Sequence, residues 1–151
     1  MTPPDIRPTP FRSGFVAILG APNAGKSTLL NRMLGQKLAI TSQKPQTTRN
    51  RILGVVHRPA AQVIFLDTPG VHRATNPLNV RIVAAALATL EEADLILLVV
   101  DAHTPDRQSE RLLLDRLRPR SLPVLLALNK IDRISRPAIL PLIERWSTDL
   151  A

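Results

Sequence analysis

Short apolar runs punctuate this chain and are separated by segments with helical periodicity. The runs are too short for typical helices and end at glycine, proline or polar residues, which predicts buried strands. They occupy residues 15–19, 51–56, 62–66, 95–100 and 124–128. The second and third runs lie close enough in the sequence to form a hairpin that turns through residues 58–61.

Apolar residues recur at helical spacing between these runs. The predicted helices span residues 27–34, 78–93, 107–117 and 137–146. Gly35 follows the first helix as a stop signal, and Pro137 suits the first turn of the last. Strands that alternate with helices predict an α/β fold, in which helices cover both faces of a mostly parallel sheet. We expect one domain over residues 13–151, after a flexible lead of residues 1–12, with a long polar loop at 38–51.

Composition narrows the class of protein. Of 151 residues, 44% are hydrophobic and 21% charged, as in an ordinary globular domain. Cysteine is absent, which excludes disulfides and thiolate metal sites. The apolar run at 95–100 is too short to cross a bilayer, so we expect a cytoplasmic location. The net charge of +8 favours polyanions such as RNA, or anionic membrane surfaces, although a solvated arginine-rich face explains it equally well.

A glycine loop follows the first predicted strand directly. It consists of Gly20, Ala21, Pro22, Asn23, Ala24, Gly25, Lys26 and Ser27, the G-x-x-x-x-G-K-[ST] pattern of a phosphate-binding loop. Gly25 lets backbone N–H groups surround an anion at the start of a helix. Lys26 places its charge between the β- and γ-phosphates, Ser27 ligates Mg²⁺, and Thr28 contacts the α-phosphate. The alternative, a glycine turn with an exposed lysine, fits the flanking strand and helix less well.

Two further loops offer contacts to the γ-phosphate and its metal ion. The motif Asp67, Thr68, Pro69 and Gly70 follows the third apolar run. Asp67 is placed to hold Mg²⁺ through a water molecule, and the Gly70 N–H to contact the γ-phosphate. The polar loop offers Thr47 and Thr48 as an additional Mg²⁺ ligand; we favour Thr48 because it directly precedes Arg49, a plain loop role being the alternative. The predicted catalytic residues are Lys26, Thr48 and Gly70.

A base-selecting motif follows the last predicted strand. It reads Asn129, Lys130, Ile131 and Asp132. The Asp132 carboxylate can accept two hydrogen bonds from guanine N1–H and N2–H₂, which adenine does not offer. Asn129 can bridge guanine N7 and the phosphate loop, and the Lys130 stem can lie along the base plane. The motif therefore predicts GTP and GDP as ligands rather than ATP.

The three motifs together resemble those of the translation-factor-related P-loop GTPases, which implies a Ras-like G domain. Residues 20–31 are similar to the group that contains Era, Der and the tRNA-modification GTPase. Residues 39–54, with Gln46-Thr47-Thr48-Arg49, resemble the Era-type family specifically. The resemblance covers nearly all of residues 12–150.

This resemblance implies partners as well as a fold. Era-type proteins bind small-subunit ribosomal RNA and assist maturation of the small ribosomal subunit, chiefly through a C-terminal KH domain. By this resemblance, we expect the present sequence to contain no KH domain and to end before the family's last strand and before the Ser-Ala loop that contacts guanine. The resemblance further implies a monomer in the cytoplasm that associates at most peripherally with the inner membrane.

Catalysis must differ from that of Ras-like enzymes, which orient water with a glutamine after D-x-x-G. Val71 stands at that position and cannot orient water, so we expect slow intrinsic turnover. By resemblance, Asn23 helps to hold a K⁺ ion, which implies stimulation by potassium. His72 is either a general base or, more simply, an exposed loop residue. His57 and His103 show no ligand spacing.

Three functions compete at this point. The leading hypothesis is a GTP-hydrolysing switch in small-subunit assembly. The second is a guanine-nucleotide-binding module with little turnover, because of Val71 and the early end of the chain. The third is a related GTPase that serves tRNA modification or large-subunit assembly, against which the segment 44–48 argues.

Overall fold

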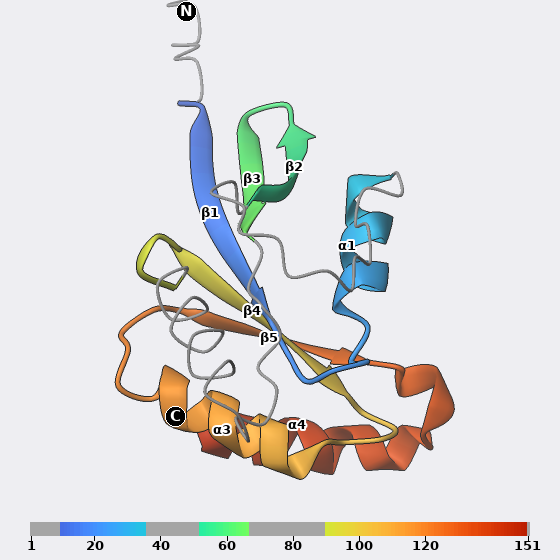
Figure 1. The fold of residues 1–151 in the computed structure, drawn as a ribbon. Helices are drawn as coiled ribbons and strands as arrows, with labels where there is room; N and C mark the ends of the chain where they lie inside the picture. The colour runs from blue at the N-terminus through green and yellow to red at the C-terminus, as the bar shows by residue number, and fades with distance from the viewer. Residues whose placement is uncertain (1–9, 36–51, 67–89, 151) are drawn as a thin grey trace, which may run out of the picture.

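The computed structural model describes residues 10–35, 52–66 and 90–150. Thr47, Thr48 and the segment from Asp67 to His72 lie outside these ranges. The described elements, in chain order, are β1 Arg12–Leu19, α1 Lys26–Leu34, β2 Ile52–Arg58, β3 Ala61–Leu66, β4 Leu95–Asp101, α3 Arg107–Leu117, β5 Val124–Asn129, the 3₁₀ turns η1 Ile131–Arg133 and η2 Arg136–Ala138, and α4 Ile139–Leu150 (Figure 1).

The strands form one sheet in the order β2-β3-β1-β4-β5. The β2–β3 pair is antiparallel and forms the predicted hairpin, whereas β3, β1, β4 and β5 run parallel. β3 and β4 lie on opposite sides of β1, so the strand order reverses between β1 and β4, which is the topological switch point of the sheet. In open α/β sheets, ligands bind beyond the carboxyl ends of the strands at such a point. The predicted mostly parallel sheet is confirmed.

Alternate residues of the central strands feed two separate cores, because successive side chains of a strand point to opposite faces. On one face, Ile18 and Val99 pack with Leu30 of α1. On the other face, Leu98 packs with α3 and with the fully buried Trp146 of α4. Helices therefore cover both faces, as the alternation of elements predicted (Figure 1).

The helix ends follow local chemistry. α1 ends at Gly35, whose φ of 71° is the left-handed conformation that glycine adopts readily, so the predicted stop is confirmed. α3 begins after Asp106, whose carboxylate accepts hydrogen bonds from the Ser109 N–H at 3.1 Å and from the Ser109 hydroxyl at 2.6 Å. These two hydrogen bonds lower the pKa of Asp106 despite the opposing effect of desolvation. The cap anchors the helix that follows β4.

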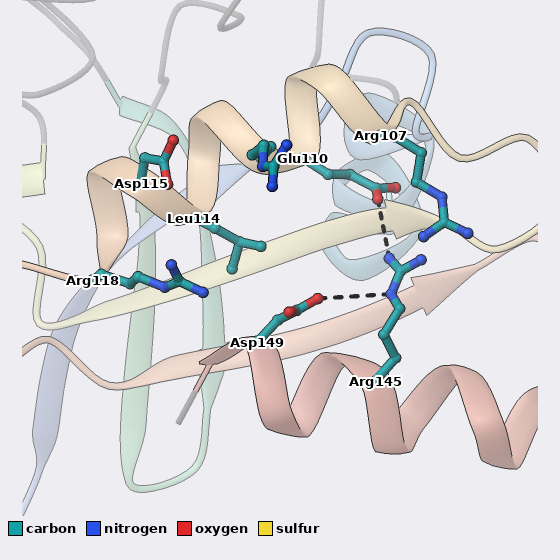
Figure 2. Close-up of a pocket in the computed structure, with 8 residues that line it drawn as sticks. Arg107, Glu110, Leu114, Asp115, Arg118, Arg145 and Asp149 are labelled. Atoms are coloured by element: carbon teal, nitrogen blue, oxygen red, sulfur yellow. Dashed lines mark hydrogen bonds and ion pairs between the residues drawn. The ribbon is translucent and has the colours of Figure 1, made fainter.

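A partly buried ion pair, in which Glu110 is the buried partner, joins α3 to α4 (Figure 2). Arg145 Nη2 donates to Glu110 Oε2 at 3.1 Å, and Arg145 Nε lies 3.7 Å from Asp149 Oδ2. Burial raises the pKa of Glu110, although the Arg145 and Arg107 guanidinium groups oppose this effect. Because breaking a buried pair leaves a charge without compensation, this contact favours one alignment of the two helices. A groove of about 360 Å³ with arginines along its walls runs beside the pair.

Two sequence predictions need correction. Pro137 lies in the 3₁₀ turn η2 rather than in the first turn of an α-helix, and α4 continues to Leu150, beyond the predicted end. Pro141 occupies the first turn of α4, where its missing N–H breaks no helical hydrogen bond. Arg12, predicted to belong to the lead, opens β1, because its N–H donates to the Ala60 carbonyl oxygen at 3.0 Å.

The remaining expectations fall at the limits of the described ranges. Of the predicted helix 78–93, only the residues from Leu90 onward are described; Leu90 and Glu91 are helical, and Leu90 is buried. The polar loop 38–51 lies outside the described residues. Across the parts that are described, no helix combines the length and the apolar character needed to span a membrane.

The assignment of the two cores predicts that two leucines on neighbouring strands contribute differently to the free energy of unfolding. Leu98 of β4 is fully buried, whereas Leu125 of β5 is 57% exposed. Leu98→Ala should lower the free energy of unfolding by about 2–5 kcal/mol through the cavity that it leaves. Leu125→Ala should cost less than about 1 kcal/mol. Urea denaturation followed by the fluorescence of Trp146, the single tryptophan, measures both. Equal losses would contradict this assignment of the core.

Candidate nucleotide-binding site

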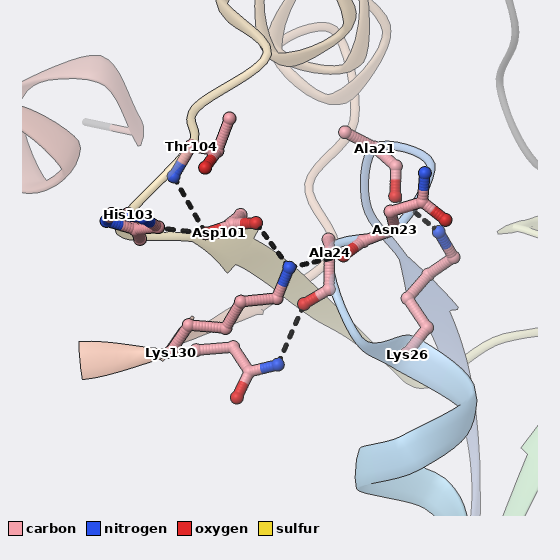
Figure 3. A network of polar contacts seen from close by, with 9 residues as sticks. Ala21, Asn23, Ala24, Lys26, Asp101, His103, Thr104 and Lys130 are labelled. Atoms are coloured by element: carbon pink, nitrogen blue, oxygen red, sulfur yellow. Dashed lines mark hydrogen bonds and ion pairs between the residues drawn. The ribbon is translucent and has the colours of Figure 1, made fainter. Parts of the chain in front are cut away.

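The carboxyl ends of β1, β4 and β5 meet at one edge of the sheet. Leu19 of β1 is in register with Leu98 of β4, and Asp101 at the end of β4 is in register with Asn129 at the end of β5. The Ala102 N–H also donates to the Asn129 carbonyl oxygen at 2.9 Å, which extends the ladder past the strands. The phosphate loop and the Asn129–Asp132 segment therefore lie side by side, although Ala24 and Asn129 are 105 positions apart in the sequence (Figure 3).

The phosphate loop leaves β1 at a glycine because no side chain fits there. A Cβ at Gly20 would lie 2.2 Å from the Val99 carbonyl oxygen of β4. The Lys26 ammonium group lies at the beginning of the loop, where Nζ donates to the carbonyl oxygens of Gly20 at 2.8 Å and Ala21 at 2.7 Å. These contacts hold the positive charge of Lys26 beside the residues that the sequence assigns to phosphate binding.

Helix α1 begins at Lys26, so the N–H groups of its first turn face the loop. Gly25 precedes it with φ 98°, and the first turn contains no acidic residue to compete for an anion. Ser27 and Thr28 are exposed in this turn, and both hydroxyls are accessible. The arrangement combines the partial positive charge of a helix N-terminus with the Lys26 ammonium group, which suits an anion such as a phosphate.

Asn129 connects the base-selecting motif to this loop. Its side-chain Nδ2 donates to the Ala24 carbonyl oxygen at 2.8 Å. Gly25 makes the approach possible, because a Cβ there would lie 2.1 Å from the same Nδ2. A trans peptide points its N–H away from its C=O, so the contact also turns the Gly25 N–H away from Asn129. The predicted bridge from Asn129 to the phosphate loop is confirmed.

Lys130 forms a second connection (Figure 3). Its backbone has φ 59°, and its Nζ donates to the Asn23 carbonyl oxygen at 2.8 Å. The same ammonium group pairs with Asp101 Oδ2 at 2.5 Å. The Lys130 side chain thus runs across the phosphate loop instead of extending into solvent. Sequence reasoning assigned a role to the stem of Lys130 but did not find these partners.

Asp101 is the site residue that sequence reasoning missed. It is buried, with 7% of its surface exposed, and its Oδ1 accepts hydrogen bonds from the N–H groups of His103 and Thr104, each at 2.9 Å. Desolvation alone would raise the pKa of Asp101, but the hydrogen bond from Lys130 and those from Thr104 and His103 outweigh it, so the pKa lies below its usual value. A signal was present, because Asp101 directly follows a buried strand, as Asn129 does.

Two further residues that the sequence assigns to base recognition follow directly after Lys130 in the chain. Ile131 and Asp132 lie in η1, where both are exposed. The Arg133 N–H donates to the Lys130 carbonyl oxygen at 3.0 Å, which holds this short turn at the end of β5. The Asp132 carboxylate is therefore accessible to a ligand at the same edge of the sheet as the phosphate loop.

The structure brings part of the predicted metal sites together. Ser27 and Asn23 lie in the described loop, both exposed, whereas Thr48, Asp67, Thr68, Pro69 and Gly70 fall outside the described residues. Leu66, which precedes Asp67 in the sequence, ends β3 in register with Ala17 of the neighbouring β1. Within the described ranges, no group of three or more His, Cys, Asp and Glu side chains could hold a metal ion.

Because Asn129 approaches Gly25 closely, a methyl group added at Gly25 should lower the stability of the fold. Gly25→Ala and Gly35→Ala both place a side chain at positive φ, which costs about 1–2 kcal/mol. A Cβ at Gly35 meets nothing within 4 Å, whereas one at Gly25 displaces Asn129. Gly25→Ala should therefore lower the free energy of unfolding by about 1–3 kcal/mol more than Gly35→Ala in urea titrations. Equal losses would show that the Asn129–Ala24 contact does not stabilise the fold.

Comparison with known proteins places this geometry in a family. A family described as "50S ribosome-binding GTPase" matches residues 15–130. "GTPase Era" of Geotalea uraniireducens is 50% identical over 137 residues, which cover 91% of this chain and 46% of that protein. "GTPase Era" of Leuconostoc citreum is 49% identical over 140 residues, or 92% of this chain and 46% of that protein. The chain spans about half the length of these curated relatives.

Solved structures agree with this match. A crystal structure of Era in complex with MgGDPNP and nucleotides 1506–1542 of 16S ribosomal RNA superposes with a TM-score of 0.75 at 43% identity, over 91% of this chain and 47% of that one. The G domain of the T. maritima FeoB iron transporter superposes with a TM-score of 0.62 at 25% identity, over 91% of this chain and 96% of that one. The chain therefore belongs to the 50S ribosome-binding GTPase family, and over nine-tenths of its length it is similar to about half the length of these Era proteins.

Proposed function

We propose that this chain binds GTP and GDP with Mg²⁺ and hydrolyses GTP to GDP and phosphate. The contact from Asn129 Nδ2 to the Ala24 carbonyl oxygen, at 2.8 Å, carries this proposal. It joins a segment with the residues for guanine recognition to a loop with the residues for phosphate binding. A nucleotide has its base at one end and its phosphates at the other, so a fixed distance between these two segments suits that ligand.

Two sets of described residues would bind different parts of the nucleotide. Gly20, Ala21, Pro22, Asn23, Ala24, Gly25, Lys26, Ser27 and Thr28 would surround the phosphates with N–H groups, two hydroxyls and one ammonium group. Asn129, Lys130, Ile131 and Asp132 would hold the base, with Asp132 accepting from guanine N1–H and N2–H₂. The proposal gives Asp67, Thr68, Pro69 and Gly70 the γ-phosphate side of the site, in line with their place after β3.

Mg²⁺ would be held by the Ser27 hydroxyl, with Thr48 and Asp67 as the further protein contacts. Hard oxygen ligands of this kind are those that Mg²⁺ prefers. When bound, the ion neutralises charge on the β- and γ-phosphates, while Lys26 and the N-terminus of α1 stabilise the same charge from the protein side. The Gly70 N–H would contact the γ-phosphate, and no side chain at Val71 would orient water.

Potassium would compensate for the missing glutamine. We assign the Asn23 side chain, which is exposed beside the phosphate loop, as a ligand of K⁺. The backbone carbonyl oxygen of Asn23 accepts a hydrogen bond from the Lys130 ammonium group, so the backbone of Asn23 is held in place and its side-chain amide oxygen can face a cation. A cation at this point adds positive charge to that of Lys26 near the phosphates.

The biological role proposed is a switch in assembly of the small ribosomal subunit, in contact with small-subunit ribosomal RNA. The similar crystal structure holds 16S ribosomal RNA, and both curated relatives are named Era, which favours the small subunit over the large subunit of the family description. The net charge of +8 suits such a partner. Residues 13–151 would act as the nucleotide-dependent domain, monomeric and cytoplasmic, with any contact to the inner membrane being peripheral.

A base-specificity experiment tests the guanine assignment. Asp132→Asn should weaken GTP and GDP binding about 100-fold and relatively favour xanthosine triphosphate, because an amide can donate to the 2-oxo group of xanthine. Isothermal titration measures each affinity. Asp115→Asn, an exposed carboxylate on α3 outside the site, is the control and should bind GDP like the wild type. Unchanged GDP affinity in Asp132→Asn would refute the assignment.

A salt comparison tests turnover and the potassium site together. Phosphate release from GTP should be about tenfold faster in KCl than in NaCl for the wild type. Asn23→Gly keeps the left-handed backbone and the carbonyl contact to Lys130 but removes the side-chain oxygen, so this stimulation should disappear. Asn23→Asp, which keeps an oxygen, should retain it. Release in neither salt, with GTP bound, would indicate a binding module without turnover.

A further inference from the structure

We infer that Asp101 is a positioning residue for the guanine site, acting through Lys130 rather than by touching the nucleotide. The inference rests on the proposed function and adds to it a residue outside the three motifs of the sequence. Asp101 ends β4, one strand away from β1, while Lys130 follows β5. The Lys130 ammonium group lies between the Asp101 carboxylate and the Asn23 carbonyl oxygen, and so connects three segments (Figure 3).

The two carboxylate oxygens of Asp101 have separate tasks. Oδ1 accepts from the N–H groups of His103 and Thr104, which fixes the carboxylate on the turn between β4 and α3. Oδ2 pairs with Lys130 Nζ at 2.5 Å. Because the carboxylate is itself held by the backbone, it offers Lys130 a fixed partner rather than a mobile one. A charged hydrogen bond to an immobile acceptor orients the lysine more strongly than an exposed ion pair does.

Lys130 needs such a partner to keep its position. A lysine has a long flexible stem and a strongly hydrated ammonium group, and a single backbone carbonyl such as that of Asn23 holds it weakly. Opposite charge on Asp101 keeps the ammonium group over the phosphate loop, so the stem is already extended along the site before a base binds. Binding then requires less ordering of the side chain, and affinity rises for GTP and GDP alike.

A merely structural role for Asp101 makes a different prediction. If the carboxylate only stabilised the turn before α3, its loss would lower stability without a specific link to Lys130. The Asp106 carboxylate caps α3, and both of its oxygens accept hydrogen bonds from Ser109 within that helix, so it represents this case in the same part of the fold. The two roles can therefore be separated in this chain.

The test is a double-mutant cycle on nucleotide affinity. Asp101→Asn keeps an oxygen that can accept from His103 and Thr104 but removes the charge that faces Lys130, whereas Lys130→Met keeps the stem and removes the ammonium group. Each single variant should bind GDP and GTP about tenfold more weakly in isothermal titration. The double variant should bind no more weakly than Lys130→Met, because both changes break the same contact.

Controls separate the outcomes. Asp106→Asn should lower the melting temperature but leave GDP affinity at the wild-type value. Wild-type affinity in Asp101→Asn, or losses that add in the double variant, would overturn the inference. If Asp101→Asn does not fold, Asp101→Glu is tested in the same cycle; additive losses there would likewise overturn it, and coupling to Lys130 would support it. If the wild type itself binds no guanine nucleotide, the proposed function fails, and the inference fails with it by a separate observation.

Discussion

The site depends on one hydrogen bond, from Asn129 Nδ2 to the Ala24 carbonyl oxygen. This hydrogen bond joins two residues that are far apart in the sequence. It exists only because Gly25 has no side chain at the point where Nδ2 approaches. Without it, the phosphate loop and the base-selecting segment would be two neighbouring loops of independent conformation. With it, the position of each segment determines that of the other, which is the requirement for binding the two ends of one nucleotide.

Because the sheet already fixes the strands, forming this hydrogen bond costs little conformational entropy. β1, β4 and β5 are parallel neighbours. β1 and β4 contribute buried side chains to both cores, and partly buried side chains of β5 pack against both, so the carboxyl ends of the three strands are fixed relative to one another. Gly20 follows β1 directly, and Asp101 and Asn129 are the last residues of β4 and β5. Polar residues placed directly after buried strands lose little additional entropy when they pair. The apolar interior thus supports the polar network at its edge.

Much of this could be predicted from the sequence, because the strongest signals are local. The apolar runs predicted β1, β4 and β5, and Gly35 predicted the end of α1, since period and stop residue each act over a few positions. The glycine loop and the motif at Asn129 predicted a phosphate loop beside a base selector, because both follow buried strands whose ends must meet. The prediction for Pro137 was wrong because a proline suits the start of a short 3₁₀ helix as well as the first turn of an α-helix.

What could not be predicted depends on distances between segments. The sequence shows that Lys130 lies beside Asn129, but not that its ammonium group reaches Asn23 and Asp101. That arrangement follows from the left-handed backbone at Lys130 and from the register that pairs Asp101 with Asn129. Neither is encoded in a short pattern, and both depend on the whole sheet. Asp101 belongs to no motif of the sequence for the same reason.

The orientation of the loop carbonyls links this network to phosphate chemistry. Side chains donate hydrogen bonds to four carbonyl oxygens of the loop. Lys26 donates to those of Gly20 and Ala21, Lys130 to that of Asn23, and Asn129 to that of Ala24. A carbonyl directed at a phosphate would repel it, so each of these contacts turns a negative dipole toward a protein donor instead. The lysines and the asparagine therefore act on an anion twice: Lys26 by its own charge, and all three by occupying the oxygens that would oppose binding. The same contacts that join the segments also make the loop more favourable for phosphate.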